Sequence, residues 1–248
     1  MLKKRIIPTL LYNDISLVKG KNFDNWRSVG SPVTSMKVYN LRDVDEIFFA
    51  FIKNKNSIFD FEFLKSLSLE CDVPLTIGGG IKSLLDVDEI LKSGADKISI
   101  NTSALENPGL IKEIVKKYGS QQIVLSVDFK KVNNELYCFT HSGKIQTNIK
   151  LLDWIIEVQK LKVGEIILCS IDCDGTMKGY DLEALQKIMK YVEIPIIISG
   201  GAGSKEDILE AFKLDVSAVS ISSLFHFTEI TPKEIKDFLN TNNIPVRL

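Results

Sequence analysis

The sequence lacks an excess of charge of either sign, with 31 lysine and arginine residues against 32 aspartate and glutamate residues in a chain of 248. A protein that binds nucleic acid mainly by neutralising phosphates needs a basic surplus, so this balance argues against that class. The chain has only 4 cysteines, too few for a disulfide framework. No apolar run approaches the roughly 18 residues that span a bilayer, and the N-terminal run is too short for a signal peptide. We therefore expect a cytoplasmic protein with reduced cysteines that binds neither nucleic acid nor membrane.

The chain also lacks a segment that would divide it. No linker rich in proline, glycine or serine and no block of like charge interrupts the sequence. Hydrophobic residues make up 45 % of the chain and charged residues 25 %, which is typical of soluble globular proteins. A chain of this length buries well over half of its unfolded surface in one core. The sequence predicts a single domain over residues 1–248.

Short β-branched runs alternate with segments of helical spacing. Runs bounded by glycine, proline or polar residues are typical of strands buried on both faces. Apolar residues recur at helical spacing in Ser83–Gly94 and Ser204–Leu214. This alternation implies a parallel sheet with right-handed crossovers, and eight strands in about 250 residues predict an α/β fold, a single (β/α)8 TIM barrel. The predicted strands are Arg5–Leu11, Glu46–Ile52, Leu75–Ile77, Lys97–Ile100, Ile123–Asp128, Glu165–Ile171, Ile196–Ser199 and Ala218–Ser222.

The two halves of the chain resemble each other. Residues 74–103 align with residues 195–224 without a gap, so that Gly79-Gly80 meets Gly200-Gly201. Further upstream, Glu46 meets Glu165 in a similar alignment. Because the shift is close to half the chain length, the pattern predicts a barrel built from two fused half-barrels.

A glycine cluster ends one predicted strand in each half, at Gly78–Gly80 and at Gly200–Gly203. Glycine lets backbone amides approach a ligand without a Cβ clash, and consecutive amides form a good phosphate site. A strand that ends in hydroxyl or amide side chains follows each cluster, over 99–102 and 220–223. The pattern predicts a substrate with two phosphates at the C-terminal face of the barrel. The alternative is that the glycines only form tight turns.

Two aspartates follow predicted strands at the same face. Asp128 suits general acid or base chemistry, or alternatively a structural hydrogen bond to a loop. Asp174 precedes a glycine and also suits an Asx-type turn. The further oxygen ligands that a metal needs are not evident, so we assign no metal and no cofactor. Of the two histidines, His226 is interpreted as a packed imidazole and His141 as a polar loop residue.

A set of short segments carries a specific family resemblance. These segments are Lys4–Ile7, Val18–Gly20, Ile77–Ile81, Gly94–Lys97, Ser99–Thr102, Asp174–Thr176, Gly179–Asp181, Ser199–Gly203 and Phe225–Phe227. On them the chain resembles HisF, the cyclase subunit of imidazole glycerol phosphate synthase, essentially from end to end. The resemblance implies a heterodimer with a HisH-like glutaminase that releases ammonia at the bottom of the barrel. Ammonia then crosses the barrel interior and joins a bis-phosphorylated aminoimidazole carboxamide ribonucleotide at the top.

The resemblance also implies roles for individual residues. Asp96 matches a position on the face that docks the glutaminase, and Lys19 matches the loop over the substrate. Four charged residues match the ammonia gate, which is alternatively an ordinary ionic plug: Arg5, Glu46, Lys97 and Glu165. The implied phosphate-binding residues are Gly80, Asn101, Thr102, Asp174, Gly175, Gly201, Ser222 and Ser223.

The chain departs from the family at the reacting centre. The family uses two catalytic aspartates, one at the end of each half-barrel's first strand. Asp128 is the second, but Leu11 occupies the first position and can neither donate nor accept a proton. Phe51 and Cys169 replace two further polar positions of the family, and Asp14 would compensate only if a loop moved it inward. Losing a proton-transfer group typically lowers a rate by about 10²–10⁴-fold, so the resemblance leaves open whether the chain is itself an enzyme.

Two functions remain. Over Pro8–Leu11 the chain resembles a subgroup of HisF-like paralogues, and this resemblance implies a subunit that channels ammonia from a glutaminase to another amidotransferase, for amidination of a nucleotide-activated surface sugar. Retention of the gate and loss of acid chemistry at the top support this reading. The alternative is the cyclase (lyase) of histidine biosynthesis, with Asp128 as the surviving acid or base. The two glycine clusters support that alternative.

Overall fold

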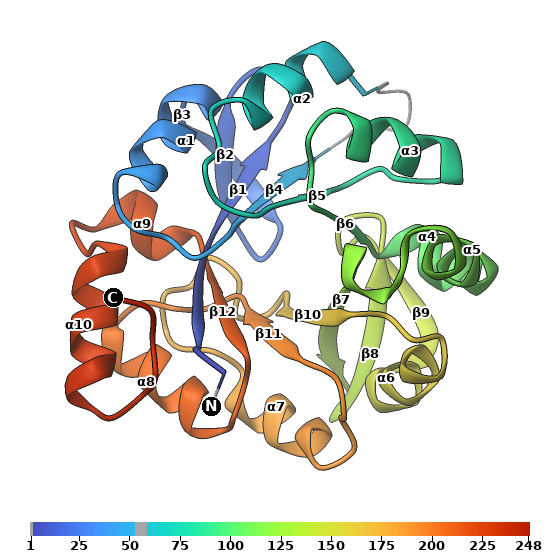
Figure 1. Ribbon diagram of the computed structural model, residues 1–248. Helices are drawn as coiled ribbons and strands as arrows, with labels where there is room; N and C mark the ends of the chain where they lie inside the picture. The colour runs from blue at the N-terminus through green and yellow to red at the C-terminus, as the bar shows by residue number, and fades with distance from the viewer. Residues whose placement is uncertain (1, 53–58) are drawn as a thin grey trace.

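The computed structural model describes residues 2–52 and 59–248 and shows a closed barrel of parallel strands surrounded by helices (Figure 1). Strand β12 pairs with β1, and β7 pairs with β10, so that the ring has no open edge. The barrel strands are β1 (Arg5–Tyr12), β4 (Ile47–Phe51), β5 (Leu75–Gly78), β6 (Lys97–Ile100), β7 (Ile123–Val132), β10 (Glu165–Ser170), β11 (Ile196–Ser199) and β12 (Ala218–Ile221). The predicted (β/α)8 barrel is therefore confirmed.

The outer helices follow the strands in chain order and form the second layer (Figure 1). They are α1 (Pro32–Asn40), α2 (Phe61–Ser68), α3 (Leu84–Lys92), α4 (Thr102–Glu106), α5 (Pro108–Tyr118), α6 (Leu151–Lys160), α7 (Leu182–Met189), α8 (Lys205–Lys213), α9 (Ser223–Phe227) and α10 (Pro232–Thr241), with a 3-10 turn at Ser120–Gln122. No helix among the described residues is long and apolar enough to cross a membrane.

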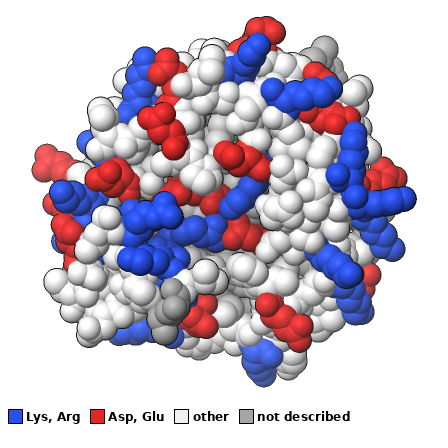
Figure 2. All heavy atoms as spheres, viewed as in Figure 1, with Lys and Arg blue, Asp and Glu red and all other residues white. Residues whose placement is uncertain are grey.

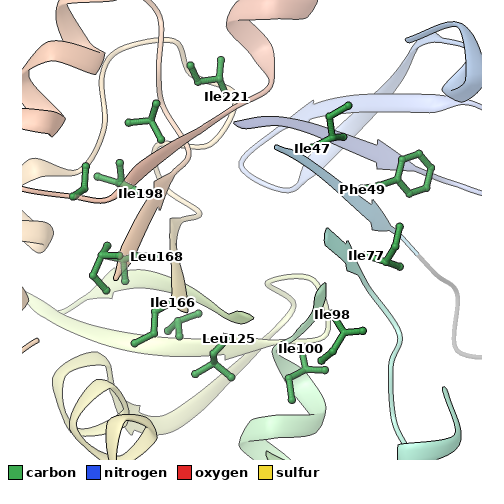
Figure 3. Packing of buried hydrophobic residues seen from close by; sticks show 14 of the residues in the cluster. Ile47, Phe49, Ile77, Ile98, Ile100, Leu125, Ile166, Leu168, Ile198 and Ile221 are labelled. Carbon is green, nitrogen blue, oxygen red and sulfur yellow. The ribbon is translucent and has the colours of Figure 1, made fainter. Parts of the chain in front are cut away.

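Alternate residues of each strand face opposite sides of the barrel wall. Outward residues pack against the helices and form the main core, and Figure 3 shows ten of them, labelled, pointing away from the barrel interior. Inward residues form a small separate apolar layer across the middle of the barrel: Ile7, Phe48, Val124, Ile167, Ile197 and Ala218. This layer separates the two ends of the barrel interior, which are both polar.

The two half-barrels share a helix-capping motif as well as the arrangement of their strands. Helix α3 begins with a capping box, in which the Ser83 hydroxyl accepts from the Asp86 amide and the Asp86 carboxylate accepts from the Ser83 amide. Helix α8 begins with the same box at Ser204 and Asp207. A capping box satisfies amides that a helix leaves unpaired at its start. The equivalence of these ends agrees with two fused half-barrels.

Each half also carries a β-hairpin that sequence analysis did not predict. Strands β2 (Leu17–Lys21) and β3 (Asp24–Gly30) follow β1, and strands β8 (Glu135–Thr140) and β9 (Ile145–Lys150) follow β7. Because β7 pairs with β8, it runs four residues beyond its predicted end at Asp128. Both hairpins extend the barrel wall at the end where the predicted site lies.

Candidate functional site

A cavity of about 580 Å³ opens at the C-terminal ends of the barrel strands. The structure places every residue predicted for the top face in its lining, from both halves of the chain. These residues are Lys19, Gly80, Asn101, Thr102, Asp128, Asp174, Gly175, Gly201, Ser222 and Ser223. The cavity is therefore the candidate active site.

The glycine clusters form matching turns on opposite sides of this cavity. Gly79 and Gly201 adopt φ values of 88° and 117°, which side-chain-bearing residues rarely adopt. A Cβ on Gly79 would lie 2.0 Å from the Phe51 carbonyl oxygen, and a Cβ on Gly201 would lie 2.0 Å from that of Gly179. Only glycine fits either turn, and both glycines line the cavity.

Several polar atoms at the cavity wall have no hydrogen-bond partner among the described residues. They are the Ser99, Ser222 and Ser223 hydroxyls and the Asn101 side-chain oxygen. Ser99 and Ser223 are only 2 % and 6 % exposed. Because an unpaired buried polar group is costly, these atoms are suited to binding a polar ligand.

Asp128 lies on β7, where it is buried and lines the cavity. Its carboxylate accepts a 2.7 Å hydrogen bond from the Asn101 side-chain amide. Burial raises the pKa of Asp128 to about 7; the charge of Asp174 adds to the rise, while hydrogen bonds from Asn101 and Ser126 oppose it. A carboxyl group with a pKa near neutral suits proton transfer in either direction.

Lys19 and Asp174 form a buried ion pair beside the cavity. The Lys19 ammonium donates to both Asp174 oxygens, at 2.8 and 2.6 Å, and the lysine is 2 % exposed. The Asn22 amide also donates to the Asp174 carbonyl, and thereby fastens the β2–β3 hairpin to the loop after β10. Sequence analysis missed this pair, because the two residues are far apart in the chain.

The three departures from the family differ in their surroundings. Leu11 lines the cavity, whereas Asp14 is exposed in the turn after β1 and is not part of the lining. Cys169 lies beside Asp128 on the neighbouring strand, and burial raises its pKa well above the ordinary thiol value. Phe51 also lines the cavity, while its ring packs in the outer core with its centre 5.4 Å from the Phe49 ring centre. Nothing in the described lining supplies a carboxylate in place of Leu11.

The opposite end of the barrel interior holds the predicted gate. The Glu46 carboxylate accepts from Arg5 at 2.8 Å and from Lys97 at 2.9 Å, while Glu165 accepts from the same two residues. Burial raises the pKa of Glu165, but Arg5 and Lys97 outweigh it and lower the pKa overall. Figure 2 shows acidic and basic side chains meeting at the centre of the face that carries the N-terminus. Asp96 is exposed on this side, where its carboxylate accepts from the Leu75 amide.

The two histidines have different surroundings. Burial lowers the pKa of His226 to about 4, and the charge of Lys19 adds to this, in agreement with a packed imidazole. His141 lines the cavity and was missed as a site residue, since its position depends on how the β8–β9 hairpin folds back. No group of three or more His, Cys, Asp or Glu side chains within residues 2–52 and 59–248 is placed to hold a metal.

The fold and site together define a class: a (β/α)8 barrel with an ionic cluster at one end and a polar cavity at its C-terminal face, where barrel enzymes carry their active sites. The chain matches the family model described as "Histidine biosynthesis protein" over residues 5–231. It is 42 % identical to the imidazole glycerol phosphate synthase subunit HisF of Thermotoga sp. (strain RQ2), over 100 % of this chain and 99 % of that protein. It is 44 % identical to the HisF subunit of Chlorobium phaeovibrioides over the full length of both. The chain belongs to the HisF family.

Proposed function

We propose that this chain is the synthase subunit of a glutamine-dependent amidotransferase and that it receives ammonia from a HisH-like glutaminase. Retention of all four gate residues in one mutually paired cluster supports this proposal. The relatives are described as subunits, which supports a partner protein. The apolar layer between gate and cavity favours passage of neutral ammonia, because an ion would lose its hydration there. Glutamine and phosphorylated nucleotides are cytoplasmic metabolites, and the proposal therefore includes a cytoplasmic location.

We further propose that the ammonia serves amidination of a nucleotide-activated surface sugar, together with a sugar amidotransferase. The observation that carries this reading is Leu11 in the cavity wall. Of the other carboxylates in the described lining, Asp174 is paired with Lys19, and Glu106 lies at the rim. Asp128 alone is a buried carboxylate without a cation partner there, so the cavity offers one proton-transfer group where the family uses two.

The second candidate is the cyclase reaction of histidine biosynthesis on a bis-phosphorylated aminoimidazole carboxamide ribonucleotide. The names of the relatives support this candidate more directly than the first. The paired glycine turns and the unpartnered hydroxyls also fit a substrate with a phosphate at each end. In this reading Asp128 is the acid or base and Leu11 lowers the rate.

Two experiments separate these candidates. Ammonium salt at alkaline pH supplies free ammonia, so turnover of the ribonucleotide by the purified chain tests the cavity without a glutaminase. We expect turnover at least about 100-fold below that of a HisF relative; equal turnover would establish the cyclase. Co-purification of the tagged chain is expected to recover a glutaminase and a sugar-modifying protein. Failure to bind any glutaminase would overturn the ammonia-channelling proposal.

A further inference from the structure

The floor of the cavity is a layer of mostly hydroxyl and thiol side chains. Each residue of the inward apolar layer is followed, two residues further along its strand, by a residue that lines the cavity. Because side chains of a strand alternate between its two faces, these residues form the next inward layer of the barrel. They are Thr9, Ala50, Ser126, Cys169, Ser199 and Ser220. All except the alanine carry a side-chain proton that can take part in hydrogen bonds.

Four neighbouring strands of the second half-barrel place such side chains next to one another. Asp128 on β7 pairs in register with Cys169 on β10. Cys169 pairs in register with Ser199 on β11, and Ser199 pairs with Ser220 on β12. Neighbouring strands lie about 4.8 Å apart, so residues paired in register stand side by side in the wall. These four residues therefore form a row along the cavity floor.

Hydrogen bonds link this row and extend it to β1. The Ser220 hydroxyl is bonded to the Ser199 hydroxyl at 3.1 Å and also to the Thr9 hydroxyl. Ser199 also hydrogen-bonds to the Cys169 thiol. In both hydroxyl pairs either oxygen can be the donor, so these bonds can reverse their direction together. Reversible hydrogen bonds in series are what the transfer of protons along a row requires.

The equivalent row of the first half-barrel lacks such groups. Leu11 on β1 pairs in register with Ala50 on β4, which pairs with Gly78 on β5. Gly78 pairs in turn with Ser99 on β6, whose hydroxyl has no hydrogen-bond partner among the described residues. In the internal repeat these four positions correspond, in order, to those of the row in the second half. The linked row is therefore a feature of the second half alone.

Thr9 brings one end of the row to the side of the cavity that lacks a carboxylate. Thr9 and Leu11 are two residues apart on β1, and both line the cavity. We propose that the row is a proton relay, which connects Asp128 with the β1 side of the cavity, where Thr9 exchanges the proton with a ligand. The inference rests on the proposed role of Asp128 as a proton-transfer group, and it extends the reach of that single carboxyl group across the cavity.

The transfer balances without any further reactant. A basic atom of the ligand takes the Thr9 hydroxyl proton, and each group of the row then takes the proton of its neighbour. Asp128 gives up the last proton, so one proton has moved from the carboxylic acid to the ligand, and the hydroxyl and thiol groups are unchanged. The reverse sequence removes a proton from a ligand. Thr9, Cys169 and Ser220 are no more than 7 % exposed, which limits replacement of the row by bulk water.

Infrared spectroscopy of the full-length chain without ligand tests the junction between the row and Asp128. The S–H stretching band of Cys169, identified by its loss in Cys169→Ala, is followed as the pH is raised through about 7, where Asp128 loses its proton. We expect the band to move to lower frequency, because the thiol then donates to a carboxylate. The band is expected to stay constant in Asp128→Asn. A band that does not respond to pH in the unchanged chain would overturn the inference.

A break at Ser220 tests whether the hydroxyl groups beyond the thiol belong to the same row. Hydrogen bonds in series strengthen one another by about 10–30 % each, so Ser220→Ala is expected to reduce the shift of the thiol band by at least about 10 %. Ser220→Thr keeps the hydroxyl and is expected to restore the shift. The matched control is Thr140→Val, which removes a buried hydroxyl of the second half outside the row and should leave the shift unchanged. A full shift in Ser220→Ala would contradict the relay.

Ammonium-dependent turnover of the bis-phosphorylated ribonucleotide tests the relay during the reaction. We expect Ser220→Ala and Thr9→Val each to lower kcat at least about tenfold, towards the loss of about 10²–10⁴-fold that follows removal of a proton-transfer group. KM is expected to stay within about twofold, because the substitutions affect proton transfer rather than binding. An unchanged kcat in both variants would overturn the inference. No turnover by the unchanged chain would count against the cyclase candidate alone, and the thiol band would still decide whether the relay exists.

Discussion

The two half-barrels have the same framework but different walls at the cavity. Glu46 and Glu165 take equivalent places in the gate, and the capping boxes of α3 and α8 use the same residue types. At the ends of the first strands the halves diverge, because Leu11 stands in one and Asp128 in the other. The duplication is therefore retained in the ionic cluster and the helix caps, and lost at the strand ends that line the cavity.

Substitutions in the predicted gate are expected to give the largest difference in unfolding free energy between the two halves. Glu46 is 3 % exposed in its side chain and also accepts from Thr76, whereas Glu165 is 15 % exposed. Removing one partner of a buried pair leaves charges uncompensated, so Glu46→Gln is expected to lower the free energy of unfolding by about 3 kcal/mol. Glu165→Gln is expected to cost about half as much, because the Glu165 side chain is itself more exposed to water than that of Glu46. Urea unfolding of both variants measures this, and a larger loss for Glu165 would contradict the ranking.

The next largest expected effect is the pH dependence of stability that is linked to the Asp128 carboxyl group. Its pKa is about 7 in the folded chain and ordinary when unfolded, so the folded state binds the extra proton between about pH 4 and pH 7. Stability linked to this group therefore falls as pH rises through that window. The free energy of unfolding of Asp128→Asn, relative to that of the unchanged chain, is expected to rise by about 2 kcal/mol as the pH is raised from 5 to 8. This follows from roughly 1.4 kcal/mol per pH unit of pKa shift. A constant difference across this range would mean that burial does not raise the pKa.

Substitutions in the capping boxes are expected to have the smallest effects on unfolding free energy, and nearly equal effects in the two halves. Ser83→Ala and Ser204→Ala each remove one side-chain cap at the start of equivalent helices. Each is expected to cost about 1 kcal/mol of unfolding free energy. Thermal or urea unfolding compares the two, and costs that differ by more than about 1 kcal/mol would show that the halves are not equivalent here.

The barrel was predictable because its signals are local. Each buried strand is a short apolar run, and the helix starts carry serine and aspartate at capping positions. Strands β3 and β9 escaped prediction because most of their residues are exposed or half-buried, so that no apolar run marks them. The contacts of these hairpins were missed for a different reason: the ion pair of Lys19 with Asp174 and the hydrogen bond of His141 with Thr102 exist only once distant segments meet.

Leu11→Asp tests the difference between the halves most directly. The experiment measures ammonium-dependent turnover of the bis-phosphorylated ribonucleotide by the unchanged chain, by Leu11→Asp and by the control Leu11→Asn. Because Leu11 already lines the cavity, we expect the aspartate to raise turnover at least about tenfold by restoring a proton-transfer group, and the asparagine to leave it low. High turnover by the unchanged chain with no gain from the aspartate would contradict the conclusion that Leu11 limits the chemistry of this cavity.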